Sequence, residues 1–140
     1  MNIGLDIHGC IDKYPSEFRE LTHRWYRNKH SIHIITGQSW SEVVDEVDGA
    51  GVAYTDTFSI VDHHLKIWTP MWKNDPRGKG WWMDATTWLL SKGTYCQESN
   101  INIHFDDTLE YAQYFPRSNC SFILVPKTGF DKIYKSFMDI

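Results

Sequence analysis

The sequence predicts one α/β domain with a three-layer, Rossmann-like fold and a central parallel sheet of about five strands. Short runs rich in Ile, Val and Phe, with few charged residues, are typical of strands buried on both faces of such a sheet. These runs lie at 3–7, 32–35, 58–61, 101–105 and 122–125. Helical patterns separate them, and alternating strands and helices indicate βαβ units. The length of 140 residues suits a single hydrophobic core.

Start signals and periodic apolar residues define the first two expected helices. Pro15 suits the first turn of a helix. The apolar face of this helix carries Phe18, Leu21 and Trp25. Ser39 and Glu42 have the spacing of a capping box for a second helix, and Gly49 is its expected end.

Two further helices are expected in the second half of the chain. Asp84 can cap a helix that extends towards Gln97. Asp107 and Glu110 form another capping signal, for a helix through about Phe115.

The segment 62–83 does not fit a core layer, and we expect a long loop or a small insertion over the sheet. It contains two prolines, two glycines and an unusual number of tryptophans. The tryptophans are Trp68, Trp72, Trp81 and Trp82. They are compatible with a lid, with stacking on a substrate base, or with a subunit interface in a homo-oligomer.

Composition excludes several classes of protein. The formal net charge of −4 argues against a broad nucleic-acid-binding face. The cysteines Cys10, Cys96 and Cys120 are odd in number and lack paired spacing, which favours reduced thiols in a cytoplasmic protein. The first residues show no signal-peptide pattern, and no apolar run is long enough to span a membrane.

Polar residues follow three of the predicted strands. Asp6 ends the first run, Thr36 and Gly37 follow the second, and Asp106 and Asp107 follow the fourth. In open parallel sheets ligands bind beyond the carboxyl ends of the strands, so these residues should converge on one crevice. Carboxylates suit a hard cation such as Mg²⁺, whereas a hydroxyl and free backbone N–H groups hold phosphate oxygens.

Three histidines invite metal-binding or catalytic interpretations. His63 and His64 are adjacent, and on an extended segment their side chains would point in opposite directions. This argues against a shared zinc ion. His104 precedes the acidic pair, and we expect a packed or hydrogen-bonded strand residue there.

The motif order resembles the haloacid dehalogenase-like (HAD-like) superfamily over nearly the whole chain. That superfamily has a first motif Asp-x-Asp-Gly-Thr/Val, then an apolar strand ending in Thr or Ser, then a lysine, then an acidic pair. The corresponding residues here are Asp6-Ile7-His8-Gly9-Cys10, Thr36-Gly37, a lysine, and Asp106-Asp107. The resemblance implies a phosphatase- or nucleotidase-type hydrolase with little or no cap, because the intervals between motifs are short.

The resemblance also implies roles for the matching residues. Asp6 would attack phosphorus and form an aspartyl-phosphate. Mg²⁺ would be held by Asp6, the backbone carbonyl of His8, and Asp106, while Asp107 would support the metal through water or fix the loop. Thr36 would bind the phosphate together with Gly37.

A lysine would offset charge between the nucleophile and the phosphate in this scheme. Lys92 precedes Asp106 by 14 residues and lies on the helix before the fourth strand, which suits the superfamily pattern. Lys79 and Lys66 are rivals from the insertion. We therefore predict Lys92 as the lysine of the site.

The sequence departs from the superfamily at His8, where its phosphatases carry a second Asp that transfers protons. An imidazole can do acid–base work near neutral pH. Three outcomes follow: His8 replaces the Asp, the enzyme prefers good leaving groups, or hydrolysis is lost while ligand binding remains.

We predict a Mg²⁺-dependent phosphohydrolase acting on a phosphomonoester such as a nucleotide. The alternative is a catalytically altered or inactive phosphate-binding protein; a receiver-like signalling domain is disfavoured because His8 and Gly9 follow Asp6 directly.

Overall fold

A five-stranded parallel sheet forms the centre of the molecule in the computed structural model, which describes residues 1–73, 80–115 and 119–140. The strand order is β3-β2-β1-β6-β7, and every neighbouring pair is parallel. The strands are β1 (Asn2–Leu5), β2 (Ser31–Thr36), β3 (Asp56–Ser59), β6 (Ile103–Asp106) and β7 (Ser121–Leu124). The predicted parallel sheet is therefore confirmed, with each strand in its predicted region.

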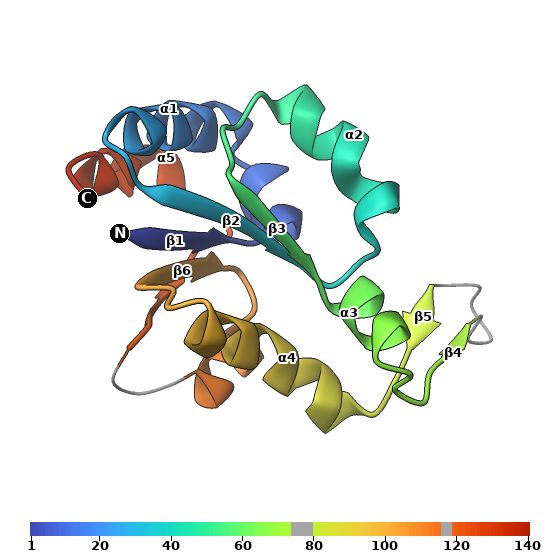
Figure 1. The fold of residues 1–140 in the computed structure, drawn as a ribbon. Coiled ribbons are helices and arrows are strands. Elements are labelled where there is room, and N and C mark those ends of the chain that lie inside the picture. The colour runs from blue at the N-terminus through green and yellow to red at the C-terminus, as the bar shows by residue number, and fades with distance from the viewer. Residues whose placement is uncertain (74–79, 116–118) are drawn as a thin grey trace.

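Helices cover both faces of this sheet, which gives the predicted three-layer α/β arrangement (Figure 1). Helices α1 (Pro15–Arg27), α2 (Trp40–Ala50) and α5 (Phe130–Ile133) cover one face. Helix α4 (Ala85–Glu98) and the short turn η2 (Leu109–Tyr114) cover the other. The first face buries most of the apolar side chains, including Phe18, Leu21 and Trp25 of α1, as the helical periodicity predicts.

The start of α2 differs from its prediction. Ser39 makes no capping bond within the helix; its hydroxyl donates to Asp62 Oδ1 at 2.7 Å. The other oxygen of Asp62 accepts from the Trp40 backbone N–H at 2.9 Å, so a side chain distant in sequence caps the helix. The helix also continues through Gly49 and ends at Ala50, before Gly51, which adopts the left-handed conformation that favours glycine (φ 72°).

Of the two helices predicted in the second half of the chain, one is confirmed and the other is not. Asp84 caps α4 as predicted, because its side chain accepts from the Thr87 backbone N–H at 3.0 Å. The helix predicted through Phe115 is only the short turn η2, and the Asp107–Glu110 capping signal is wrong. Thr108 begins that turn, and its hydroxyl donates to Asp107 at 3.1 Å. Asp107 is thereby left outside the turn and exposed.

The described residues of the segment 62–83 include regular secondary structure. Strand β3 ends at Ser59, and helix α3 (Ile60–Lys66) follows directly, so the strand predicted at 58–61 turns into a helix halfway. Two short antiparallel strands, β4 (Trp72–Lys73) and β5 (Trp81–Trp82), form a separate ribbon beyond α3. The described residues of the segment add no strand to the central sheet. Residues 74–79 lie outside the described part of the chain.

The last residues pack against α1 and were not assigned from the sequence. Phe130 of α5 stacks on Phe18 with ring centroids 4.9 Å apart. Trp25 donates its indole N–H to the carbonyl of Phe137, in the turn η3 (Tyr134–Phe137), at 2.8 Å. In the described residues no helix is both long and apolar enough to cross a membrane.

Candidate functional site

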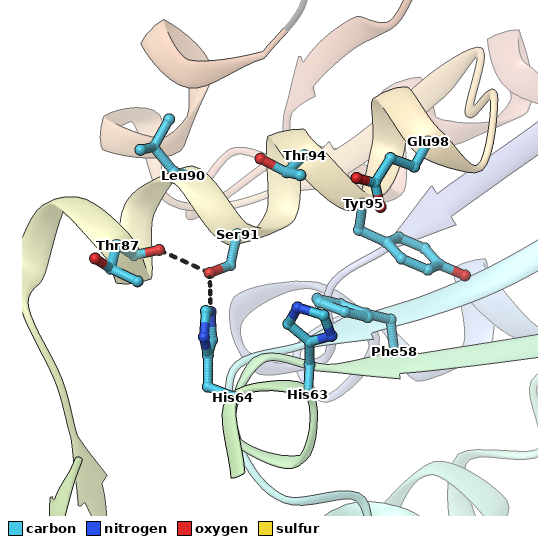
Figure 2. A pocket seen from close by; sticks show the side chains of 9 residues that line it. All are labelled: Phe58, His63, His64, Thr87, Leu90, Ser91, Thr94, Tyr95 and Glu98. Atoms are coloured by element: carbon cyan, nitrogen blue, oxygen red, sulfur yellow. Dashed lines mark hydrogen bonds between the residues drawn. The ribbon is translucent and has the colours of Figure 1, made fainter. Parts of the chain in front are cut away.

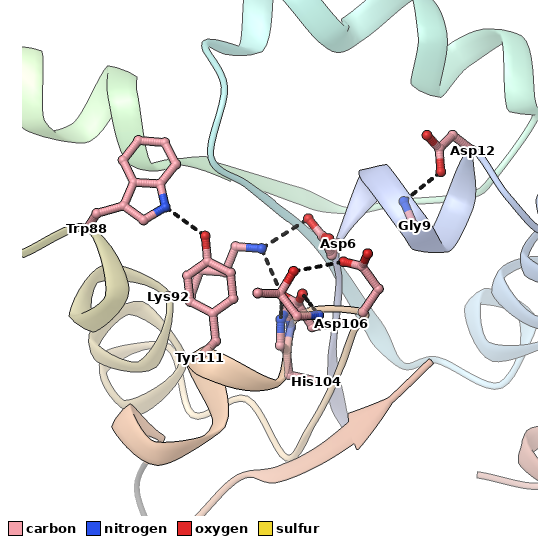
Figure 3. Close-up of polar contacts among 10 residues, drawn as sticks. Asp6, Gly9, Asp12, Trp88, Lys92, His104, Asp106 and Tyr111 are labelled. Atoms are coloured by element: carbon pink, nitrogen blue, oxygen red, sulfur yellow. Dashed lines mark hydrogen bonds and ion pairs between the residues drawn. The ribbon is translucent and has the colours of Figure 1, made fainter. Parts of the chain in front are cut away.

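A buried lysine joins two strand-end carboxylates at the centre of the candidate site (Figure 3). Lys92 Nζ lies 3.0 Å from Asp6 Oδ1 and 2.7 Å from Asp106 Oδ2. Asp6 directly follows β1 and Asp106 ends β6, so the parallel pairing of these strands brings the two carboxylates to one edge of the sheet. Lys92 reaches them from α4, which crosses that face. All three side chains are buried.

Asp106 is held by the protein on both of its oxygens. Oδ2 accepts from Lys92 and from His104 Nε2, the latter at 2.9 Å, and Oδ1 accepts from the Thr108 backbone N–H at 3.0 Å. Burial lowers the pKa of His104, so the imidazole is neutral and donates its Nε2–H to Asp106. This agrees with the prediction of a packed, hydrogen-bonded His104. The arrangement anchors Asp106 beneath Lys92, with its side chain 0% exposed.

The ionisation of the two aspartates differs because their partners differ. Burial and the nearby charges of Asp106 and Asp107 raise the pKa of Asp6 to about 7, against the opposing effect of Lys92. Burial also opposes ionisation of Asp106, but Lys92 and the His104 hydrogen bond hold its pKa below the usual range. The two carboxylates in turn raise the pKa of Lys92 despite burial, so the ammonium stays charged. The negative charge of ionised Asp6 is therefore compensated less well by its surroundings than that of Asp106.

Asp107 approaches Asp6 across a glycine. Gly9 has a positive φ of 83°, and a Cβ there would collide with the Asp107 carboxylate. Its backbone N–H donates to Asp12 Oδ1 at 2.7 Å, which holds the turn η1 (Ile7–Ile11) in shape. The ligand atoms of Asp6, Cys10 and Asp107 lie within 4.8 Å of one another. Burial raises the pKa of the Cys10 thiol, so the two carboxylates are the better cation ligands.

His8 faces a different partner. Its Nε2 lies 3.2 Å from Glu46 Oε2 of α2, and its side chain is 43% exposed. His8, Asp12 and Glu46 form a second exposed group whose side-chain atoms lie within 4.8 Å of one another. The structure thus pairs the imidazole with Glu46 at the rim, whereas Asp6 is paired with Lys92 inside.

Thr36 and Gly37 lie at the carboxyl end of β2, the strand next to β1. Thr36 is buried, and among the described residues no hydrogen bond joins it to Asp6 or Lys92. Gly37 lies against the Trp88 ring, since a Cβ on it would come within 2.5 Å of that ring. Its carbonyl accepts from the Val61 N–H at 3.2 Å, which fixes the loop after the strand.

Two aromatic residues beside Lys92, Trp88 and Tyr111, had no predicted role in the site. The ammonium of Lys92 lies 4.5 Å from the centre of the Tyr111 ring, an attractive cation–π geometry. The Tyr111 hydroxyl accepts from Trp88 Nε1 at 2.7 Å. Trp88 and Lys92 are four residues apart on α4, so helical spacing already placed them on one face. Tyr111 comes from η2 and had no comparable signal.

Of the two alternative lysines, the structure describes only Lys66, which does not take part in this network. Lys66 is exposed in the last turn of α3. Lys79 lies outside the described residues. Lys92 is thus the lysine that the structure brings together with Asp6 and Asp106.

His63 and His64 lie in α3, so their expected extended conformation is wrong, and they border a separate cavity of about 380 Å³ between α3 and α4 (Figure 2). His64 Nε2 lies 2.7 Å from Ser91 Oγ, which donates to the Thr87 carbonyl at 2.7 Å. Its Nδ1 lies 2.7 Å from Thr69 Oγ1. Burial lowers the pKa of His64, so this neutral imidazole is satisfied on both nitrogens and holds α3 against α4.

Neither a family model, a curated protein nor a solved structure matches the chain. Membership of the HAD-like superfamily stays a prediction, which rests on the motif order.

Proposed function

We propose that the protein is a Mg²⁺-dependent phosphohydrolase of the HAD-like superfamily that cleaves a phosphomonoester through an aspartyl-phosphate on Asp6. The observation that carries this proposal is the buried Lys92, bonded to Asp6 at 3.0 Å and to Asp106 at 2.7 Å. A buried ammonium between strand-end carboxylates is suited to offset charge as a phosphoryl group approaches. In the described residues Lys92 bonds only Oδ1 of Asp6, so Oδ2 accepts no hydrogen bond and is available for attack.

The charges of the cluster fit a divalent cation. Asp6, Asp106 and Asp107 bear three negative charges when ionised, against one positive charge on Lys92, which leaves an excess of two. Asp6 and Asp107 offer the oxygen ligands that Mg²⁺ prefers, and the backbone carbonyl of His8 would be the third protein ligand. Held there, a Mg²⁺ ion would offset the charge of the substrate phosphate and would favour the ionised form of Asp6. We assign Asp107 to the metal and Asp106 to the positioning of Lys92, because Asp106 is fully engaged within the protein.

The proposed reaction has two displacements. The free oxygen of Asp6 attacks phosphorus, the bond to the leaving oxygen breaks, and that oxygen takes up a proton. Water then attacks the phosphorus of the aspartyl-phosphate, which releases phosphate and restores the Asp6 carboxylate. Lys92 holds Oδ1 throughout, so the nucleophile keeps one orientation. We propose His8 as the group that gives and takes the proton at the rim.

A second candidate is favoured by the pairing of His8 with Glu46 at 3.2 Å. In this alternative the imidazole stays with Glu46 and the protein binds a phosphorylated ligand without efficient turnover. The two candidates predict the same binding site and differ only in hydrolysis.

Phosphate release from p-nitrophenyl phosphate and a panel of phosphomonoesters tests the proposal, with Mg²⁺ or with EDTA. We expect release that requires Mg²⁺, is lost in Asp6→Asn, and is kept in Asp45→Asn, an exposed aspartate of α2. Release that persists in Asp6→Asn would contradict the proposal. Binding of inorganic phosphate without any release would select the second candidate.

A further inference from the structure

A second cavity, of about 630 Å³, opens beside the candidate site. Its volume is within the usual range for small-molecule pockets. Its lining is mostly aromatic and apolar, with a polar edge from the segment after β2. The principal lining residues are Trp81, Trp82, Trp88, Met83, Gln38 and Glu42. We propose that this cavity binds the nucleobase of a nucleoside monophosphate whose phosphate lies at Asp6; the inference rests on the proposed function.

Continuous contacts connect this cavity to the charged cluster (Figure 3). Trp88 lines the cavity, and its Nε1 donates to the Tyr111 hydroxyl at 2.7 Å. The Tyr111 ring lies 4.5 Å from Lys92 Nζ, which bonds Asp6. On the other side, Gly37 packs under Trp88 and directly follows Thr36. In this proposal the anionic end of one molecule lies at Asp6 and its planar end lies among the tryptophans, with Trp88 between the two parts.

The chemistry of the cavity lining indicates that the base of the nucleotide, and not its phosphate, binds in the cavity. Among the lining residues that the structure describes, Glu42 is the charged side chain, and its carboxylate repels a phosphate; Lys73 Nζ lies 5.6 Å from the centre of the Trp81 ring. Indole rings stack on planar bases with little dependence on sequence. Glu42 and Gln38 at the polar edge offer oxygens that accept from exocyclic amino groups. A base that carries an amino group, such as adenine, guanine or cytosine, satisfies both features.

Trp81 lies in strand β5 of the ribbon and lines the cavity, so its substitution tests whether a base stacks there. Kinetics are measured on nucleoside 5′-monophosphates and on ribose 5-phosphate, which lacks the base. Stacking on one aromatic ring predicts that the best nucleotide exceeds ribose 5-phosphate in kcat/KM by about 10-fold to 100-fold. Trp81→Ala should reduce this ratio about 10-fold, whereas Trp81→Phe should keep most of it. The matched control is Trp68→Ala, because Trp68 is 91% exposed and outside the cavity.

Binding to the Asp6→Asn variant separates this inference from the proposed hydrolysis. Calorimetry with AMP, GMP, CMP and ribose 5-phosphate should give at least about 10-fold tighter binding of a nucleotide, with the advantage lost on adding Trp81→Ala. That result without phosphate release by the unaltered protein would sustain the inference and overturn the hydrolysis. Equal binding of ribose 5-phosphate and every nucleotide would overturn the inference, even if other esters are hydrolysed.

Discussion

Lys92 of α4 donates a 3.0 Å hydrogen bond to Asp6, a residue 86 positions earlier in the chain at the end of β1. The bond spans the layer between helix and sheet and brings a buried cation to a buried carboxylate. Because the same ammonium bonds Asp106, removal of Lys92 would leave two carboxylates without their shared partner.

Lys92→Met should destabilise the protein strongly. Removing one partner from a buried ion pair costs roughly 3–5 kcal/mol, since the remaining charges stay desolvated. We expect a loss of that order in the free energy of unfolding, measured by urea denaturation at pH 7. Lys66→Met is the control, because Lys66 is exposed on α3 and should change stability by less than about 0.5 kcal/mol. Equal stabilities of the two variants would contradict the buried network.

Gly9→Ala should displace Asp107 and weaken Mg²⁺ binding. The position has φ 83°, and the added methyl group would meet the Asp107 carboxylate. We expect that at least about a 10-fold higher Mg²⁺ concentration is needed to raise the melting temperature by the same amount. The free energy of unfolding should also fall by about 1 kcal/mol or more.

Gly49→Ala provides the matched control for this variant. Gly49 lies inside α2, and an added Cβ would meet no atom within 4 Å. Alanine is favoured over glycine within a helix by roughly 0.5–1 kcal/mol, so this variant should be unchanged or more stable. If both variants respond to Mg²⁺ like the unaltered protein, Asp107 does not bind the metal.

Asp6→Asn should stabilise the metal-free protein at high pH. Burial and neighbouring carboxylates raise the pKa of Asp6 from 3.8 to about 7, so the native state holds this proton more tightly than the unfolded chain. The Asp6 contribution therefore lowers the free energy of unfolding as pH rises from about 4 to 7. In EDTA at pH 8 we expect the variant to be more stable by at least about 1 kcal/mol, and the gain should shrink towards pH 4.

Mg²⁺ provides the control for that titration. The cation compensates the charge of Asp6, so it should stabilise the unaltered protein at pH 8 more than the variant. If the difference in stability between Asp6→Asn and the unaltered protein does not change between pH 4 and pH 8, the pKa of Asp6 is not raised in the folded protein.

His8→Asn should slow the release of poor leaving groups most. Alkyl phosphates need a proton on the leaving oxygen, whereas p-nitrophenolate leaves without one. We expect a loss of about 10²-fold or more in kcat for alkyl esters and a much smaller loss for p-nitrophenyl phosphate. Glu46→Gln removes the carboxylate that lies 3.2 Å from the imidazole and should alter the pH profile of alkyl ester hydrolysis. Equal effects of His8→Asn on both esters would exclude the proton-transfer role.

The sheet was predictable because its strands are short apolar runs and their alternation with helices restricts the topology. The cap of α2 was not, because Asp62 lies 22 residues from the Trp40 N–H it accepts from. Local capping patterns contain no information about such distant partners. At η2 the contacts are local instead: the Thr108 backbone N–H donates to Asp106 and its hydroxyl donates to Asp107, whose carboxylate lies within 4.8 Å of Asp6.

The meeting of Asp6, Lys92 and Asp106 could be predicted from strand ends and motif order. The different environments of Asp106 and Asp107 could not be predicted in this way. Asp106 and Asp107 are adjacent, yet one is buried against His104 and the other is exposed beside Gly9. Which neighbour turns inwards depends on the end of β6 and on packing around His104, and both are tertiary features.

Trapping the covalent intermediate is the decisive test of the proposed aspartyl-phosphate on Asp6. The protein would be mixed with p-nitrophenyl phosphate and Mg²⁺, quenched in acid within one turnover, and examined by intact-protein and peptide mass spectrometry. We expect one phosphoryl group on the peptide that contains Asp6, absent with EDTA and absent in Asp6→Asn. Burst release of p-nitrophenol with no phosphoryl group on Asp6, or with one on another residue, would contradict it.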